Sequence, residues 1–398
     1  MYGGVMRAPA AGFPAPRMIA STSDLAELCG RLKQEPFVTI DTEFVRERTY
    51  WPELCLVQLA GTQDVAVIDA LAEGIDLAPL AALLDEPACL KVFHAARQDL
   101  EIFLHLFDRL PQSIFDTQIA AMVAGHGDQI GYDALVSAVT GGAIDKTHRF
   151  SDWSARPLTP AQIAYAAADV THLRDVYLTL RKELTDQDRQ HWADAELAEL
   201  TRPETFRPDP YRLWERLKPR TNNRRMLGVL REIVAWREGE AQNLDIPRQR
   251  LIRDESLLEI AAVQPDDVDA LARVRGVTRG FAEGRAGAAL LEAVRTGTGL
   301  PEAVLPRAPR KPEGARASAA LVALLRVLLA AKCEENQVAP KLVASGEDLD
   351  HLALGRTDLP VLQGWRRAVF GEDALALLAG QLALSVDGKQ VRLTRRSQ

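Results

Sequence analysis

The chain has 398 residues, of which 47% are hydrophobic, and its formal net charge is −7 at pH 7. This length predicts two or three domains with sizeable cores, and the net acidity is unusual for a nucleic-acid-binding protein, although binding depends on local patches. No apolar run approaches the roughly 18 residues that a membrane-spanning helix needs, which excludes a helical membrane protein.

The N-terminal segment and the cysteines indicate where the protein works. Residues 1–17 are rich in Gly, Ala and Pro and lack the apolar centre of a signal peptide, so we expect a disordered tail, with organellar targeting as the alternative. The four cysteines, at positions 29, 55, 89 and 333, form no CxxC pair. They predict reduced, mostly buried thiols in a cytoplasmic protein.

The first predicted strand ends in two acidic residues. Residues 37–40 form an apolar, β-branched run that is typical of a buried strand, and Asp41 and Glu43 follow it. Residues i and i+2 of a strand share a face, so both carboxylates point the same way and repel unless a cation lies between them. The next residue, Phe44, could stack on a terminal base or pack in the core.

The following elements predict an α/β domain. Strands are expected over 54–60 and 64–69, antiparallel because their connections are short. A helix, a strand and a helix follow across 77–107, and a short strand is expected near 113–115. This alternation predicts a mixed sheet flanked by helices on both faces.

Asp99 is predicted in the first turn of the helix that follows the strand 90–93. A carboxylate is favoured there by the helix dipole, so an ordinary N-terminal Asp is the alternative to a metal ligand. His94, at the end of that strand, could contact a metal or substrate, but a structural role is the alternative because hard cations prefer oxygen ligands. Asp116 is expected to cap the next helix, and support of the metal ligands from behind them is the alternative.

Tyr165 and Asp169 are predicted on one face of a long helix. Thr159 is expected as its N-cap and Pro160 as its first residue. The i, i+4 spacing places the two side chains one turn apart. Local packing of the tyrosine hydroxyl against the carboxylate is the alternative.

These motifs supply four carboxylates and a tyrosine in one domain. Four crowded carboxylates cannot all ionise cheaply without cations, and two divalent ions, Mg²⁺ or Mn²⁺, would neutralise them. Such a set predicts a nuclease in which one metal activates water and the other stabilises the leaving oxygen. Tyr165, with an ordinary pKa of about 10, would orient the water rather than act as sole base.

The segments DTEF, HAARQDLEIF, FDTQ and YAAADV, in this order, resemble the DEDD 3′–5′ exonucleases of the subgroup with tyrosine in the third motif. The surrounding VRERTYWPELCLVQLA and DKTHRFSDWSARPLTPAQIAYAAADV closely resemble the ribonuclease D family, over about residues 18–205. The metal ligands implied by the resemblance are Asp41, Glu43, Asp99 and Asp169. The resemblance also implies a ribonuclease H-like fold, Tyr165 as the residue that positions water, and trimming of structured RNA, notably tRNA precursors, to nucleoside 5′-monophosphates.

A proline cluster at 203, 208 and 210 marks the end of the first domain, and the strand signal vanishes beyond it. Residues 206–298 are predicted to be helical and resemble the HRDC domain, a small all-α bundle. A proline-rich linker is expected over 299–316, and residues 317–398 are expected to form a second, diverged HRDC-like helical bundle. The basic residues at the C-terminus are expected in a frayed tail.

Basic residues in two regions are candidates for RNA contacts. Residues 202–253 hold thirteen Lys and Arg against seven Asp and Glu, a net charge of +6, which indicates a phosphate-binding patch. A solvated surface with ion pairs is the alternative. The candidate side chains in the first region, the loop before Trp153, are Lys146 and Arg149. Those in the second region, residues 202–253, are Arg220, Arg224 and Arg225.

Two other functions stay open at this point. A DNA exonuclease would carry the same motifs, because the sugar is distinguished by whichever group contacts the 2′-OH. A noncatalytic nucleic-acid-binding scaffold would have no reason to keep all five motif residues. We expect a monomer that does not associate with membranes.

Overall fold

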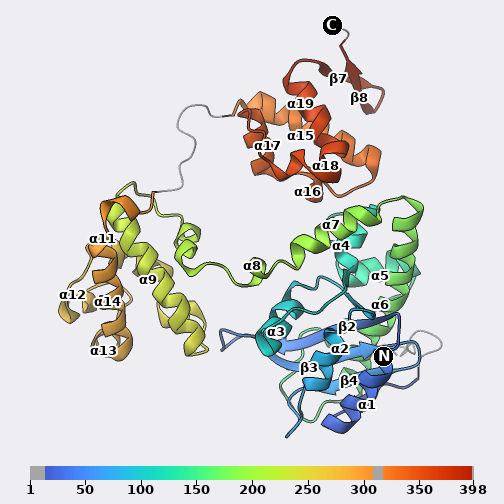
Figure 1. The fold of residues 1–398 in the computed structure, drawn as a ribbon, viewed down its shortest axis with the longest axis horizontal. Helices are drawn as coiled ribbons and strands as arrows, with labels where there is room; N and C mark the ends of the chain where they lie inside the picture. Colours follow the sequence, from blue (N-terminus) through green and yellow to red (C-terminus); the bar gives the residue numbers. More distant parts are fainter. Residues whose placement is uncertain (1–13, 308–316, 397–398) are drawn as a thin grey trace, which may run out of the picture.

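The structure is a computed structural model that describes residues 14–307 and 317–396 (Figure 1). An α/β domain is followed by two predominantly helical domains, as predicted. Of the tail expected over 1–17, residues 1–13 lie outside the described residues, and Arg17 already begins a strand. Among the described residues, no helix combines the length and apolar character needed to cross a membrane.

A six-stranded mixed sheet of order β1-β4-β3-β2-β5-β6 forms the centre of the α/β domain. β2, β3 and β4 are antiparallel neighbours, which confirms the prediction, and the other pairings are parallel. The strands are β1 (Arg17–Ile19), β2 (Phe37–Val45), β3 (Glu53–Ala60), β4 (Val65–Asp69), β5 (Leu90–Phe93) and β6 (Ile114–Asp116). The sequence did not reveal β1, because three residues are too few to show an alternation.

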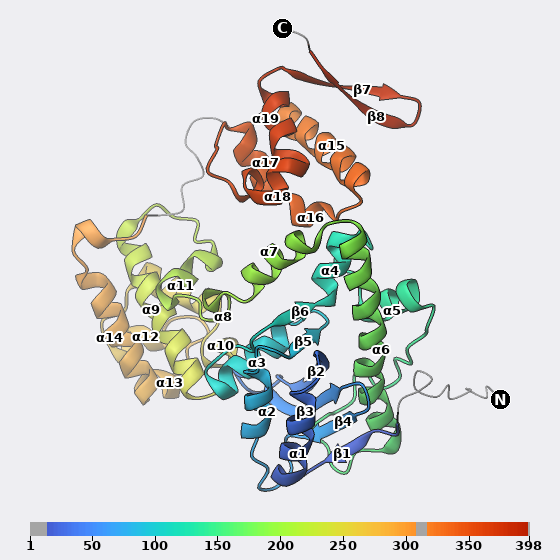
Figure 2. The ribbon, with the colours of Figure 1, turned by 45° about the vertical axis from the view of Figure 1, so that its right-hand side comes forward.

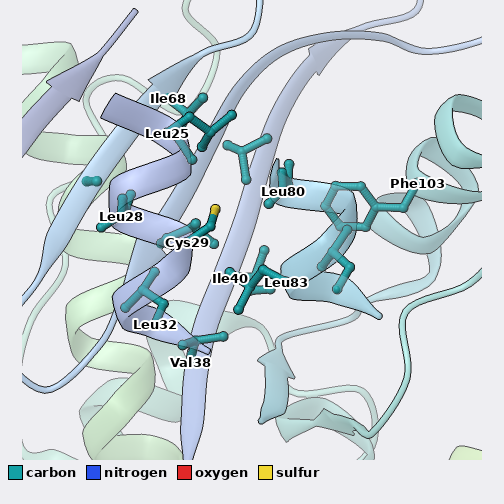
Figure 3. Packing of buried hydrophobic residues seen from close by; sticks show 14 of the residues in the cluster. Leu25, Leu28, Cys29, Leu32, Val38, Ile40, Ile68, Leu80, Leu83 and Phe103 are labelled. Carbon is teal, nitrogen blue, oxygen red and sulfur yellow. The ribbon is translucent and has the colours of Figure 1, made fainter. Parts of the chain in front are cut away.

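Three helices cover one face of this sheet: α1 (Thr22–Leu32), α2 (Ala78–Leu84) and α3 (Arg97–Phe107). Figure 3 shows leucines of α1 and α2 packed around Val38 and Ile40 of β2. Because side chains alternate along a strand, Asp41 lies on the opposite face.

The long helix α6 (Pro160–Asp186) covers that opposite face. Its start is confirmed: Thr159 is the N-cap and forms a capping box with Gln162. The Thr39 hydroxyl of β2 donates to the Val170 carbonyl of α6 at 2.7 Å, so helix and strand are joined directly. The remaining helices of the domain are α4 (Thr117–Ala124), α5 (Tyr132–Thr140), α7 (Gln190–Leu200) and α8 (Pro203–Phe206).

The first helical domain packs around α9 (Arg224–Asn243) and α14 (Arg285–Gly299). A Cβ at Gly297 would lie only 2.5 Å from Val229 Cα, so this close crossing needs glycine. The shorter elements are the 3₁₀ helix η1 (Pro210–Leu217), α10 (Arg248–Leu251), α11 (Asp254–Val263), α12 (Val268–Ala272) and α13 (Arg279–Glu283).

The predicted linker 299–316 begins later than expected. Residues 302–304 form the 3₁₀ helix η2 (Glu302–Val304), and Leu305 is buried against Gly228. The first part of the segment therefore belongs to the first helical domain, and residues 308–316 lie outside the described residues.

The last domain is helical as predicted, except at its C-terminal end. Its helical elements are α15 (Ala319–Asn336), α16 (Pro340–Val343), α17 (Gly346–Ala353), η3 (Pro360–Leu362), α18 (Gly364–Arg366), the π-helical turn η4 (Arg367–Gly371) and α19 (Glu372–Leu378). The expectations of an all-α bundle to the end and of a frayed basic tail were wrong. β7 (Leu382–Asp387) and β8 (Gln390–Arg395) form an antiparallel hairpin. Alternating apolar residues around a two-residue Gly388-Lys389 turn favour it, because Gly388 supplies the positive φ that the first position of such a turn requires.

The loop between β2 and β3 is joined to the first helical domain (Figure 2). The Tyr50 hydroxyl donates to Glu238 Oε1 at 2.6 Å and accepts from Arg248 Nη2 at 2.6 Å, and Arg248 also pairs with Glu238. Asp245 Oδ1 accepts the backbone N–H groups of Tyr50 and Trp51, both at 3.0 Å. We call these five residues the interdomain clasp.

The last domain is attached at a different place, on α7. Glu196 accepts hydrogen bonds from Trp365 Nε1 at 3.1 Å and from Arg366 Nη2 at 2.7 Å. The ring of Trp192 stacks on Trp365 with a centroid distance of 4.7 Å. Each helical domain therefore has its own contact with the α/β domain.

Candidate active site

Three of the predicted carboxylates meet between β2 and α6. One ligand oxygen each from Asp41, Glu43 and Asp169 lie within 4.8 Å of one another. The strand supplies the first two because i and i+2 share a face, and the hydrogen bond from Thr39 to Val170 fixes the turn of α6 that carries the third. The convergence of two motifs that are about 130 residues apart is thereby observed.

Asp99 is attached to the same strand from α3. It lies in the first turn of that helix, as predicted, and its Oδ1 accepts a hydrogen bond from Thr42 Oγ1 at 2.5 Å. Asp99 is not one of the three residues whose oxygens converge within 4.8 Å. Besides burial, however, the charge of Asp41 raises the pKa of Asp99 and the charge of Asp99 raises the pKa of Glu43, so Asp99 lies close to them. We call Asp41, Glu43, Asp99 and Asp169 the acidic cluster.

Burial and mutual repulsion disfavour ionisation of the acidic cluster. Burial raises the pKa of Asp41 to about 6. Burial, and then the charges of Asp41, Asp169 and Asp99, raise the pKa of Glu43 to about 9. The pKa values of Asp99 and Asp169 are also raised, first by burial and then by Asp41. Because oxygen ligands and excess negative charge suit a hard divalent cation, the cluster fits a metal ion.

Tyr165 lies one turn before Asp169 and contributes a neutral phenol. Burial and the charge of Asp169 raise its pKa far above neutral, so the hydroxyl remains a donor at physiological pH. A hydrogen bond from this phenol lowers the pKa of Asp169, although burial outweighs it. Trp153 stacks on the Tyr165 ring with centroids 6.0 Å apart, which fixes its orientation.

Sequence reasoning missed Tyr132, the first residue of α5. Its hydroxyl donates to the backbone carbonyl of Asp169, and burial followed by the charge of Asp169 raises its pKa. Tyr132 therefore anchors the turn of α6 that presents Asp169. No spacing rule connects these two positions, since the bond crosses between separate helices.

The structure places two predicted substrate contacts in structural surroundings. Phe44 is half-buried and packs against the core on the α1–α3 side. Of the two roles considered for it, base stacking and core packing, the structure shows core packing. His94 Nδ1 lies 3.0 Å from the Thr117 hydroxyl, and its ring lies 5.2 Å from that of Tyr132. Asp116 caps α4 as expected.

The predicted basic residues of the loop before α6 differ in their partners. Lys146 forms an ion pair of 2.6 Å with Asp133 of α5. Arg149 lies over the ring of Phe150 at 5.4 Å and is close enough to lower the pKa of Tyr165 slightly against burial. Phe150 is 91% exposed, and Arg149 is exposed as well, so both are accessible in this loop.

The basic patch of the first helical domain is mostly engaged within the domain. Arg224 donates to the carbonyls of Glu302 and Leu305 at 2.8 and 2.7 Å. Arg225 donates to the carbonyls of Thr298 and Leu300 at 2.9 and 2.5 Å. Both side chains tie the segment after α14 to the start of α9, and their contacts with RNA stay a prediction. Arg220 is exposed, as a phosphate contact would require.

The fold and the site define a class of protein. A mixed sheet carries an acidic cluster, a neutral tyrosine lies on the covering helix, and helical domains follow. The chain matches a family model for a 3′–5′ exonuclease over residues 16–185, so the class is that of the 3′–5′ exonucleases. It also matches a model for an HRDC domain over residues 226–294. The HRDC match lies in the first helical domain. The likeness of the last domain to HRDC stays a prediction.

Similar proteins identify the family. Ribonuclease D of Gluconacetobacter diazotrophicus is 66% identical over 97% of this chain and 98% of its own length. Ribonuclease D of Granulibacter bethesdensis is 64% identical over 96% of this chain and 97% of its own length. The crystal structure of Escherichia coli RNase D, described as an exoribonuclease involved in structured RNA processing, matches with a TM-score of 0.79 at 30% identity, covering 92% of this chain and 99% of that one. The chain belongs to the ribonuclease D family.

Proposed function

We propose that the protein is a 3′–5′ exoribonuclease that shortens structured RNA, including tRNA precursors, and releases nucleoside 5′-monophosphates. The observation that carries this proposal is the meeting of Asp41, Glu43 and Asp169 beside Asp99 and a neutral Tyr165. The E. coli relative, described as acting in structured RNA processing, supports RNA as the substrate.

The acidic cluster would hold two divalent cations, Mg²⁺ or Mn²⁺. Bound cations would supply an activated water and stabilise charge on the leaving 3′-oxygen. The chain's own residues would do the positioning: β2 fixes Asp41 and Glu43, and Tyr132 and Thr39 fix the α6 turn that carries Asp169. Tyr165 would donate a hydrogen bond to the attacking water, since its phenol stays protonated.

We also propose that the enzyme acts as a cytoplasmic monomer. The four cysteines are free and buried, and burial raises the pKa of each thiol. Thiols of this kind persist in a reducing compartment.

The deciding experiment uses a 5′-labelled RNA with a structured body and a free 3′ tail, beside the DNA of the same sequence. Wild type and Asp41→Ala are compared with Mg²⁺, with Mn²⁺ and with chelator. A metal-dependent ladder that shortens from the 3′ end in wild type, and is absent in the variant, is expected, with RNA preferred over DNA. Faster loss of the DNA would favour a DNA exonuclease, and intact substrate in every lane with retained binding would favour a noncatalytic scaffold.

The stability of the metal-free protein should fall as the pH rises from about 5 toward 9. Asp41 and Glu43, with pKa values of about 6 and about 9, hold protons in the folded protein that the unfolded chain has already released. Stability therefore decreases with rising pH in this range, and bound Mg²⁺ should restore it by mass action. Thermal unfolding at pH 5.5 and pH 8.5 should show the larger Mg²⁺-induced rise in Tm at pH 8.5.

The control for this prediction is NaCl at the same ionic strength, which screens charge without binding the cluster. An Mg²⁺ effect equal to that of NaCl at both pH values would contradict the proposed metal site.

A further inference from the structure

One polar side chain beside the acidic cluster has no assigned role. Gln58, in the middle of β3, is completely buried, with 0% of its surface exposed. Among the described residues, neither Nε2 nor Oε1 of its carboxamide has a hydrogen-bond partner. A buried amide without partners is destabilising, and buried polar groups in native proteins are normally paired.

The sheet register places Gln58 next to a proposed metal ligand. Its Cα is paired directly with that of Asp41 across the β2–β3 ladder. Residues directly opposite one another on antiparallel strands project to the same face, with Cβ atoms roughly 4.5–5.5 Å apart. The side chains of Gln58 and Asp41 therefore start from neighbouring positions on the face that α6 covers, without a hydrogen bond between them.

The neighbours of Gln58 along its own strand on this face are apolar. Leu56 and Ala60, two residues before and after it on β3, belong to the cluster that packs against Ala167 and Val170 of α6. By contrast Thr39, on the same face of β2, uses its hydroxyl to bond the Val170 carbonyl at 2.7 Å. A glutamine kept only for packing in this setting would be less favourable than a leucine or methionine.

We propose that Gln58 is a positioning residue for Asp41: when a cation is bound, its carboxamide N–H, which has no partner in this structure, donates to the Asp41 carboxylate and sets the direction in which that carboxylate presents an oxygen to the cation. This inference rests on the proposed function, because Asp41 needs a fixed direction only if it binds a metal. Groups that orient a metal ligand in this way typically change metal affinity by roughly 10–100-fold when they are removed.

The test is Gln58→Met, which keeps the length of the side chain and removes the donor. Mn²⁺ is titrated against the metal-free protein, and binding is read from the rise in Tm and from calorimetry. The variant should bind Mn²⁺ at least ~10-fold more weakly than wild type, and excess Mn²⁺ should restore RNA cleavage. The metal-free variant should unfold at the same temperature as wild type or higher, since an unpartnered amide has been removed.

Leu56→Met is the matched control, because it lies on the same strand and face, opposite Glu43, and loses no donor. It should bind Mn²⁺ as wild type does. Gln58→Leu repeats the test with a shorter apolar side chain in case methionine packs poorly.

Two results would overturn the proposal, and they differ from a failure of the proposed function. Equal Mn²⁺ affinity of wild type and both Gln58 variants would remove the positioning role while leaving the metal site intact. A metal-free Tm that falls while the Mn²⁺ affinity is unchanged would make Gln58 a packing residue. Absence of Mn²⁺ binding by wild type itself would overturn the metal site, and with it this role.

Discussion

Replacing Asp169 with asparagine should abolish exonuclease activity and at the same time stabilise the metal-free protein. The substitution keeps the shape of the side chain but removes one charge from the acidic cluster. Burial and the charge of Asp41 raise the pKa of Asp169, so its ionised form is unfavourable without a cation. We expect a rate loss on the order of 10³-fold or more, since the stabilisation of charge at the reaction centre would be disrupted.

Single-turnover cleavage of the labelled RNA measures the first effect, and urea unfolding in chelator at pH 8 measures the second. Asp175→Asn is the matched control, because Asp175 lies on the same helix and is exposed. The control should keep wild-type activity and gain no stability. An Asp169→Asn enzyme that cleaves RNA at the wild-type rate would remove Asp169 from the proposed metal site.

Replacing Arg248 with alanine should loosen the first helical domain from the α/β domain. Only 3% of the Glu238 side chain is exposed, and it accepts hydrogen bonds from Arg248 and Tyr50. Removing the guanidinium leaves a buried carboxylate without its ionic partner, which costs about 3 kcal/mol. Differential scanning calorimetry should show a lower Tm or a separate transition for the first helical domain.

The pH dependence of this effect has a defined sign. Burial pushes the pKa of Glu238 upward, but hydrogen bonds from Arg248 and Tyr50 outweigh burial and leave it below its ordinary value. A lowered carboxyl pKa stabilises the fold above the unfolded pKa, and this contribution is lost as the pH falls through the folded value. In Arg248→Ala, burial is no longer outweighed, so the folded pKa of Glu238 rises, and the stability difference from wild type should be largest at neutral pH and shrink as the pH falls and the carboxyl takes up a proton.

The control for the clasp is Arg285→Ala. Arg285, at the start of α14, pairs with Glu240, which lies on α9 as Glu238 does. In contrast to the clasp, 80% of the Arg285 side chain is exposed. Exposed ion pairs contribute roughly 0–1 kcal/mol, so this variant should unfold almost as wild type does. If Arg248→Ala costs no more than Arg285→Ala, the clasp does not hold the two domains together.

The parts of the site that could be predicted follow from local rules. An apolar β-branched run placed Asp41 and Glu43 on a central strand, and alternation put them on one face. Contrary to expectation, the strand does not end at these residues but continues to Val45. The Thr-Pro start of α6 set the helical phase, which placed Tyr165 and Asp169 one turn apart.

The parts that could not be predicted depend on contacts between separate elements. The hydrogen bond from Tyr132 to the Asp169 carbonyl joins α5 to α6, and no periodicity in either segment indicates it. A count of charges over residues 202–253 suggested a basic patch, but it could not show that Arg224 and Arg225 are used by backbone carbonyls of their own domain. The hairpin β7–β8 was missed because β7 closely follows the Ala- and Leu-rich helix α19 and its own Leu-Ala-Leu start suits a helix equally well.

The separate attachment of each helical domain has a consequence for the connection between them. The clasp holds the first helical domain, and Glu196 with Trp365 and Arg366 holds the last, so neither needs the other in order to stay on the α/β domain. The covalent connection between residues 307 and 317 then acts mainly by raising the effective concentration of one docking partner for the other. A chain cleaved there should therefore remain a single complex under native conditions.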